Sequence, residues 1–126
     1  SWISQASFSP PGLSIAVAKD RAVEALLHTG DSFALNVLSV DRKHNLLKRF
    51  LQPFDPGEDR FKGLSISSSP NGQPLLKEAL AWLEGSVKQR MECGDHWLIY
   101  AEVKHGEVLD NNSFTAVHHR RTGATY

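Results

Sequence analysis

The chain has 126 residues, enough for one domain with a core of its own. Its 14 basic and 14 acidic side chains give a formal net charge of zero, which argues against a nucleic-acid or anionic-membrane partner. The single cysteine, Cys93, excludes an internal disulfide and favours a cytoplasmic location. The sequence has no apolar run of about 18 residues, so no membrane-spanning helix is predicted.

The first thirty residues are predicted to hold a strand and a short helix. Residues 1–8 are compatible with extended backbone, although their alternation is weak, and Pro10-Pro11 then forces extended geometry. The stretch GLSIAVA at 12–18 is apolar and β-branched and predicts a buried strand. Asp20 is predicted to cap a short helix that Gly30 closes.

The middle of the chain repeats this strand–helix pattern before a loop. SFALNVL at 32–38 alternates between apolar and polar positions and predicts a second strand. Asp41 is predicted to cap a second helix that runs to Leu51. Residues 53–62 form a polar loop, and the serine-rich segment 63–72 ends in Pro-Asn-Gly, which predicts a turn.

Two long strands are expected in the last third. Gly85 and Val87 disfavour a helix over 79–93, so this segment is predicted to be a strand. The sequence 97–108 is a clearer strand, and Gly94-Asp95-His96 predicts the hairpin turn between them. A short final strand is expected at 116–121.

Short strands with turn signals between them predict a mainly β barrel or sandwich decorated by two short helices. The number of strands is low for a closed barrel. The chain is therefore expected either to lack a piece or to be completed by a partner.

Motifs for common catalytic and metal chemistry are missing from the sequence. The six histidines stand in no zinc-binding spacing, so no metal site is predicted. There is also no nucleophile elbow, Walker loop or GxGxxG motif. Lys19 ends a predicted strand just before a helix start, with Arg21 following, which is either an anion site or a solvated basic turn. His96 either belongs only to its turn or donates a hydrogen bond to a ligand.

An ordered set of motifs resembles the flavin reductase-like family, the FMN-binding split barrel. The set comprises Ser-Trp at 1–2, Ser-Phe-x-Pro-Pro at 7–11, SIAVAK at 14–19, FALNVL at 33–38 and Gly-Asp-His at 94–96. The resemblance covers nearly the whole chain. It implies an antiparallel split β-barrel with two or more short helices over residues 1–126, lacking its N-terminal strand or strands.

Within this family, the sequence of the first 38 residues is most similar to the C-terminal flavin reductase module of diflavin flavodiiron proteins. That resemblance implies hydride transfer from NAD(P)H to FMN. It further implies onward electron transfer to a diiron centre that reduces dioxygen, with diiron and flavodoxin-like domains as partners. The family also implies a homodimer. The sequence alone does not choose between NADH and NADPH; Arg120-Arg121 is one candidate for binding a ribose 2′-phosphate, against an exposed basic pair.

The resemblance also implies the residues of the flavin site. His96 would face the nicotinamide or the flavin, and Cys93 has no implied role. Since the flavin accepts the hydride, no side chain acts as a nucleophile. The residues implied to bind the cofactor are Ser1, Trp2, Ser4, Gln5 and Ser7, then Ala18 and Lys19 near the FMN phosphate, Phe33 and Asn36 supporting the pocket, and Tyr126 at its border.

Two other functions remain open from the sequence. One is a split-barrel module that binds FMN only as an electron relay, without nicotinamide turnover. The other is a small β-barrel interaction domain that binds no cofactor.

Overall fold

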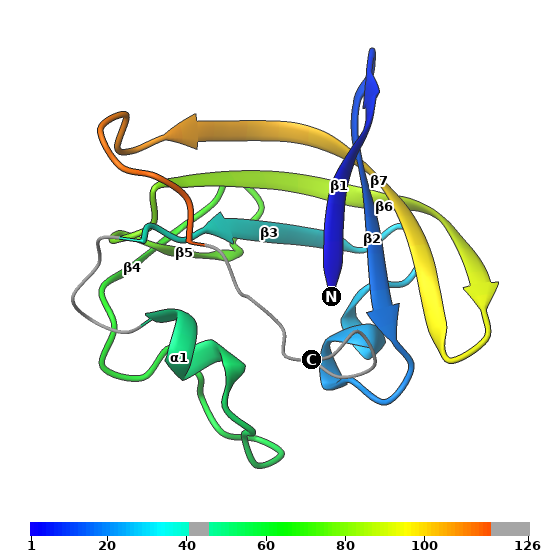
Figure 1. Ribbon diagram of the computed structural model, residues 1–126, viewed down its shortest axis with the longest axis horizontal. Coiled ribbons are helices and arrows are strands. Elements are labelled where there is room, and N and C mark those ends of the chain that lie inside the picture. The colour runs from blue at the N-terminus through cyan, green and yellow to red at the C-terminus, as the bar shows by residue number, and fades with distance from the viewer. Residues whose placement is uncertain (41–45, 117–126) are drawn as a thin grey trace.

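The computed structural model describes residues 1–40 and 46–116. Five strands form one antiparallel sheet in the order β1-β2-β7-β6-β3, and a separate hairpin pairs β4 with β5 (Figure 1). The predicted mainly β, antiparallel architecture is confirmed. The strands are β1 (Trp2–Phe8), β2 (Pro11–Ala18), β3 (Ser32–Val37), β4 (Ile66–Ser68), β5 (Pro74–Leu76), β6 (Ala81–Cys93) and β7 (His96–Val108).

The β6–β7 hairpin is the longest element of the fold, and both β2 and β3 pair with it. Its two strands of 13 residues pair along their whole length, and the tight turn between them places Gly94 at a φ of 59°, which glycine adopts easily. Register shifts between Glu84 and Gly85, and between Val87 and Gln89, interrupt the ladder. Such bulges bend a strand and increase its twist, so the sheet curls around its apolar face.

One face of this curved sheet carries the main core. Because side chains alternate along each strand, the core positions recur at every second residue of β2 and β7. The buried cluster comprises Leu13, Ile15, Val17, Leu27, Val87, Ile99 and Ala101, with Phe33 and Trp97 among the partly buried residues packed against it. The residues between these positions point to the opposite, outer face.

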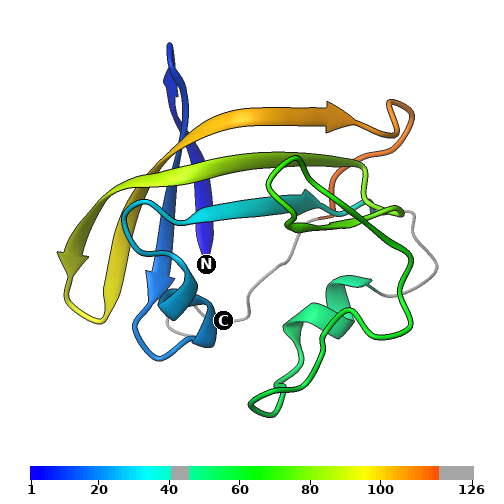
Figure 2. The same ribbon diagram turned by 180° about the vertical axis from the view of Figure 1, so that it is seen from behind.

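Two short helices lie on the same side of the long β6–β7 ribbon, as both views show (Figures 1 and 2). They are the 3-10 helix η1 (Ala22–Leu26) and the α-helix α1 (Leu46–Leu51). The predicted capping of the first helix by Asp20 is wrong, since the N-cap is Arg21 and no side chain caps it. This helix also ends before Gly30. The second predicted helix is confirmed, whereas its predicted cap, Asp41, lies outside the described residues.

The segment 63–76 holds more structure than its sequence predicts. The expected Pro-Asn-Gly turn is present, and the backbone N–H of Gly72 donates to the carbonyl of Ser69 at 2.9 Å. Strands β4 and β5 flank this turn, although only the turn was predicted. The predicted final strand at 116–121 lies almost wholly outside the described residues; Thr115, just before it, bridges to Ser39.

Candidate functional site

Three segments that are distant in sequence meet at one end of the sheet. The start of β1, the end of β2 and the β6–β7 turn are brought together because Trp2 pairs with Ala16 and Ala18 pairs with His96. The Trp2 ring lies against the His96 imidazole with centroids 5.0 Å apart. The backbone N–H of Lys19 donates to the carbonyl of Asp95 at 2.9 Å. Four of the predicted site residues therefore lie at this end of the sheet: Trp2, Ala18, Lys19 and His96.

Asp95 holds the His96 ring beside Trp2. Its carboxylate Oδ1 lies 2.7 Å from His96 Nδ1. The hydrogen bond and the charge interaction with His96 lower the pKa of Asp95 below its ordinary value of 3.8, so the carboxylate is ionised at neutral pH. An imidazole oriented by a carboxylate next to an exposed aromatic ring can pack on a planar ligand and donate a hydrogen bond to it.

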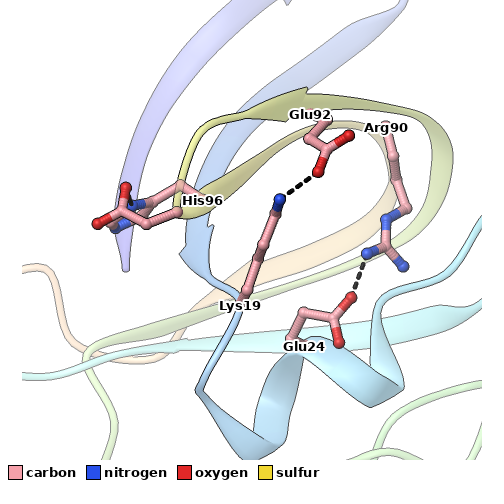
Figure 3. Close-up of polar contacts among 6 residues, drawn as sticks. Lys19, Glu24, Arg90, Glu92 and His96 are labelled. Atoms are coloured by element: carbon pink, nitrogen blue, oxygen red, sulfur yellow. Dashed lines mark hydrogen bonds and ion pairs between the residues drawn. The ribbon is translucent and has the colours of Figure 1, made fainter.

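Lys19 turns to the other face of the sheet. Its ammonium forms an ion pair with Glu92 (Figure 3). The same ammonium lies 5.5 Å from the centroid of the Trp97 ring. Glu92 and Trp97 face each other across β6 and β7 and alternate with the outward His96. The hydrogen bond from Lys19 lowers the pKa of Glu92 below its ordinary value of 4.5. The lysine charge is therefore already engaged within the chain.

A second ion pair, near Lys19, connects the sheet to η1. Arg90 reaches from β6 to Glu24 on η1 (Figure 3). Its guanidinium lies 4.3 Å from the centroid of the same Trp97 ring. The Arg90 side chain is 9% exposed, and its Nε and Nη1 atoms have no hydrogen-bond partner among the described residues. Such a buried pair ties η1 to the sheet and so fixes the segment that follows Lys19.

The outer face presents two rows of side chains in register across the strands. One row is apolar and exposed: Trp2 is 45%, Leu98 37% and Met91 56% exposed. The next row is polar and comprises Ser4, Ser14, Tyr100 and Gln89. An exposed apolar row that runs across the face of a sheet is typical of a surface that another molecule covers.

A groove of about 480 Å³ opens beside Ser1, between the segment after β2 and the loop after α1. Its lining includes two arginines and two phenylalanines, and the Arg60 guanidinium lies 4.5 Å from the centroid of the Phe54 ring. Its lining residues are Ser1, Asp20, Arg21, Ala22, Val23, Phe50, Leu51, Gln52, Pro53, Phe54 and Arg60.

The other predicted cofactor residues lie away from this end. Gln5 and Ser7 follow Ser4 along β1, and Phe33 packs against the core. The Asn36 side chain donates to the Pro74 carbonyl at 3.2 Å and accepts from Leu76 N–H at 2.8 Å, so it fastens β5 to β3. Since Asn36 pairs with Trp82, it lies at the opposite end of β6 from Glu92. Tyr126, Arg120 and Arg121 lie outside the described residues.

Arg60 and Phe54 are the residues that sequence reasoning missed. Their loop was recognised only as polar, and nothing in its spacing relates it to residues 20–23. An arginine between two phenylalanines in a polar loop was the one available clue. Within residues 1–40 and 46–116, no group of three or more metal-ligating side chains occurs, and no helix is long and apolar enough to cross a membrane.

Comparison with known proteins gives one family and a set of long relatives. The family described as flavin reductase like domain matches residues 1–125. Diflavin flavoprotein A 1 of Synechocystis sp. PCC 6803 is 52% identical over 126 residues, covering 100% of this chain and 22% of that protein. A diflavin flavoprotein A relative from Nostoc sp. PCC 7120 is 57% identical with the same coverage. The chain thus spans about a fifth of the length of these curated relatives.

Solved structures give the same fold. The NADH:FAD oxidoreductase SgcE6 of Streptomyces globisporus C-1027 superposes with a TM-score of 0.79 at 27% identity, covering 90% of this chain and 66% of that one. BorF, the flavin reductase component of a bacterial two-component tryptophan halogenase, gives 0.68 at 28% identity over 86% of this chain and 69% of its own. The predicted split-barrel fold is confirmed.

Proposed function

The chain belongs to the flavin reductase-like domain family, and from this membership we propose that residues 1–126 form one domain that binds FMN and transfers hydride to it from NAD(P)H. The observation that carries the proposal is the contact of the Trp2 ring with His96, at the end of the sheet where Ala18 and the backbone of Lys19 also lie. These residues come from separate segments of the chain, and each was implied by the flavin reductase motifs. The names of SgcE6 and BorF, both above 25% identity, support the reaction class.

In this proposal β1 lines the flavin. It is an edge strand of the described sheet, and an edge strand presents backbone N–H and carbonyl groups that can bond to a ligand. Ser4, Gln5 and Ser7 add hydroxyl and amide groups along the same strand. The flavin supplies the hydride-accepting chemistry, so the chain needs to bind and orient two planar rings.

The Trp2–His96 pair is proposed to orient the nicotinamide against the flavin. Asp95 fixes the imidazole, and the Trp2 ring limits its rotation from the other side. Further back, Phe33 and Asn36 support the pocket indirectly, since they fix β3 against the core and β5. The family resemblance implies Ala18 near the FMN phosphate and Tyr126 at the border of the pocket, and both assignments are part of this proposal.

The wider reaction is proposed from the long relatives. Their printed names describe diflavin flavoproteins, of which this chain corresponds to 22%. We propose that electrons pass from the flavin held by this chain to flavodoxin-like and diiron domains, where dioxygen is reduced. We favour FMN over FAD as the bound flavin because these relatives are named as diflavin flavoproteins. A cytoplasmic location remains a prediction from the single cysteine.

A homodimer is proposed on the outer face of the sheet. The apolar row of Trp2, Leu98 and Met91 crosses four strands in register, next to the row of hydroxyl groups that begins at Ser4. A second copy placed on this row would cover it and would also enclose the outward face of His96. This arrangement is supported by the exposure of the row and by its continuity with the proposed flavin site.

Flavin binding is the first test of this function. The chain, expressed with any flanking sequence that its gene encodes, is freed of flavin and titrated with FMN, FAD and riboflavin while flavin fluorescence is recorded. Saturable quenching at micromolar FMN, weakened by Trp2→Ala but not by the remote Lys104→Ala, is the expected result. Absence of any flavin binding would leave only the cofactor-free interaction domain.

A further inference from the structure

A second groove, which we call the β4 groove, lies at the end of the sheet opposite the β6–β7 turn (Figure 1). Its volume of about 440 Å³ is within the range of roughly 300–1,000 Å³ found for binding sites. One wall is a face of the β4–β5 hairpin, and the other is formed by the start of β6 and the end of β7. No residue of the proposed flavin site lines it.

The β4–β5 hairpin has one satisfied edge and one open edge. Ile66 pairs with Leu76, and Ser68 pairs with Pro74. On the β5 edge, the Asn36 side chain donates to the Pro74 carbonyl at 3.2 Å and accepts from the N–H of Leu76 at 2.8 Å. Leu76 and Pro74 therefore direct these backbone groups away from β4. In an antiparallel ladder their partners Ile66 and Ser68 direct theirs away from β5.

The open edge is on β4. All three residues of this strand are exposed, and no described residue outside the hairpin bonds to the backbone of Ile66 or Ser68. Their outward N–H and carbonyl groups form a short edge to which an extended chain can add as a further strand. Since side chains alternate along a strand, every second side chain of the added strand would lie on the groove side of the hairpin.

The β4 groove combines an apolar lining with two opposite charges. Its apolar residues are Trp82, the buried Leu75 and the exposed Leu109. Lys77 and Glu107 are exposed, and among the described residues neither forms an ion pair. The lining therefore suits a polypeptide segment that carries an apolar side chain and charged residues of both signs.

The small size of this edge favours a segment of the same polypeptide. Three strand residues offer too little area for a separate protein, since stable interfaces between proteins bury about 1,200–2,000 Å². A tethered segment needs less area, because its effective concentration can reach the millimolar range. The curated relatives that match all of this chain extend well beyond it, since the chain covers only 22% of each.

We propose that the β4 groove docks an extended segment of the same polypeptide from outside residues 1–126. The segment adds to the open edge of β4 as a third strand, places an apolar side chain on Trp82, and pairs its charged residues with Lys77 and Glu107. Docking at this end of the sheet leaves the proposed flavin site uncovered. The inference does not depend on flavin binding.

Hydrogen exchange of the full-length protein tests the added strand. The amides of Ile66 and Ser68 are bonded only if another strand is present, and they are then expected to exchange at least about 100-fold more slowly than in an unstructured peptide. Ser68→Pro removes an outward N–H and no bond of the β4–β5 ladder, and an edge position tolerates proline. It is expected to speed exchange at Ile66 about 10-fold or more. Ser68→Ala keeps the N–H and is expected to change that rate less than twofold.

Carbodiimide coupling identifies the occupant, because it joins a carboxylate only to an amine that lies beside it. In the full-length protein, Lys77 or Glu107 is expected to couple to a residue outside 1–126, and the product keeps the mass of one polypeptide. Lys77→Glu is expected to speed exchange at Ile66 about threefold or more. The charge-matched Lys48→Glu, on α1, is expected to change it less than twofold.

Three results would each overturn the inference. They are unprotected exchange at Ile66 and Ser68 in the full-length protein, equal exchange in Ser68→Pro and Ser68→Ala, and coupling of Lys77 and Glu107 only within residues 1–126. A covalent dimer joined through either residue would also overturn it and would identify a second copy as the occupant. Melting curves show whether each variant folds; if Ser68→Pro does not, the comparison of Lys77→Glu with Lys48→Glu decides.

Discussion

Glu84 is a fully buried glutamate near the start of β6. Its Oε2 accepts hydrogen bonds from the Ser69 hydroxyl and, at 3.2 Å, from the N–H of Asn71, while Oε1 has no partner among the described residues. A buried carboxylate is unfavourable unless it is hydrogen-bonded, so this contact holds the β4–β5 turn against the sheet.

Substitution of Glu84 tests this role. Glu84→Ala removes both acceptors and is expected to lower the free energy of unfolding by about 1–3 kcal/mol. Glu84→Gln keeps an acceptor of the same shape and removes the buried charge, so it is expected to cost less. Urea denaturation measures both, and equal midpoints for Glu84→Ala and the unsubstituted chain would exclude the role.

The Lys19–Glu92 pair makes stability depend on pH. Lys19 lowers the pKa of Glu92 in the folded state below the ordinary value of 4.5, so the unfolded chain binds the proton more readily. The contribution of the pair is present above pH 4.5 and is lost as the pH falls through the lowered pKa. Glu92→Gln should therefore lower the urea midpoint of unfolding at pH 7 relative to the unsubstituted chain. Near pH 3 the two midpoints should differ little. A reduction of the same size at both pH values would contradict this.

At the scale of elements, the sequence identifies the longer strands and misses the shortest ones. β2 is predicted from its apolar, β-branched run, β3 from its alternation, and β6 because Gly85 and Val87 disfavour a helix, while β7 has the clearest strand sequence. β4 and β5 have three residues each, too few for a period to appear. The helix cap at Asp20 failed because the chain enters η1 one residue later, where the Arg21 backbone is extended with φ −88° and ψ 132°.

Gly85 was recognised only as a residue that disfavours a helix, and the structure gives it a specific role. A Cβ at this position would lie 2.4 Å from the carbonyl oxygen of Glu102 and 3.3 Å from the Phe33 ring. The glycine therefore allows β6 and β7 to approach at the bulge while Phe33 packs into the core.

Gly85→Ala should separate these strands and lower the free energy of unfolding by about 1–3 kcal/mol or more. The neighbouring Ser86→Ala serves as the control and is expected to melt close to the unsubstituted chain. Thermal melting followed by circular dichroism compares the two. Equal melting temperatures would show that the strands do not need this close approach.

Only part of the candidate site was predictable, because sequence motifs identify residues but do not show which loops fold next to them. Trp2, Lys19 and His96 could be named because they belong to motifs that recur in order along the chain. Arg60 could not, since it reaches the groove only after the loop that follows α1 folds back toward residues 20–23. The pairing of Lys19 with Glu92 likewise depends on the register of β6 and β7, which no local pattern specifies.

At the scale of the whole molecule, the outer apolar row predicts self-association. Met91 lies on this row but outside the proposed flavin contacts, and it is 56% exposed. Met91→Lys places a charge in the proposed interface and should shift the sedimentation coefficient from dimer towards monomer, whereas Met91→Leu should not. If the two variants sediment alike, a second copy does not cover this row.

Reduction of bound flavin by a nicotinamide tests the central claim most directly. The flavin-loaded protein is mixed anaerobically with NADH or NADPH while absorbance near 450 nm is followed. The account predicts saturable bleaching with at least one of the two, slowed by His96→Ala at unchanged FMN occupancy. Flavin that stays bound and oxidised with both nicotinamides would contradict a reductase and leave only an electron relay.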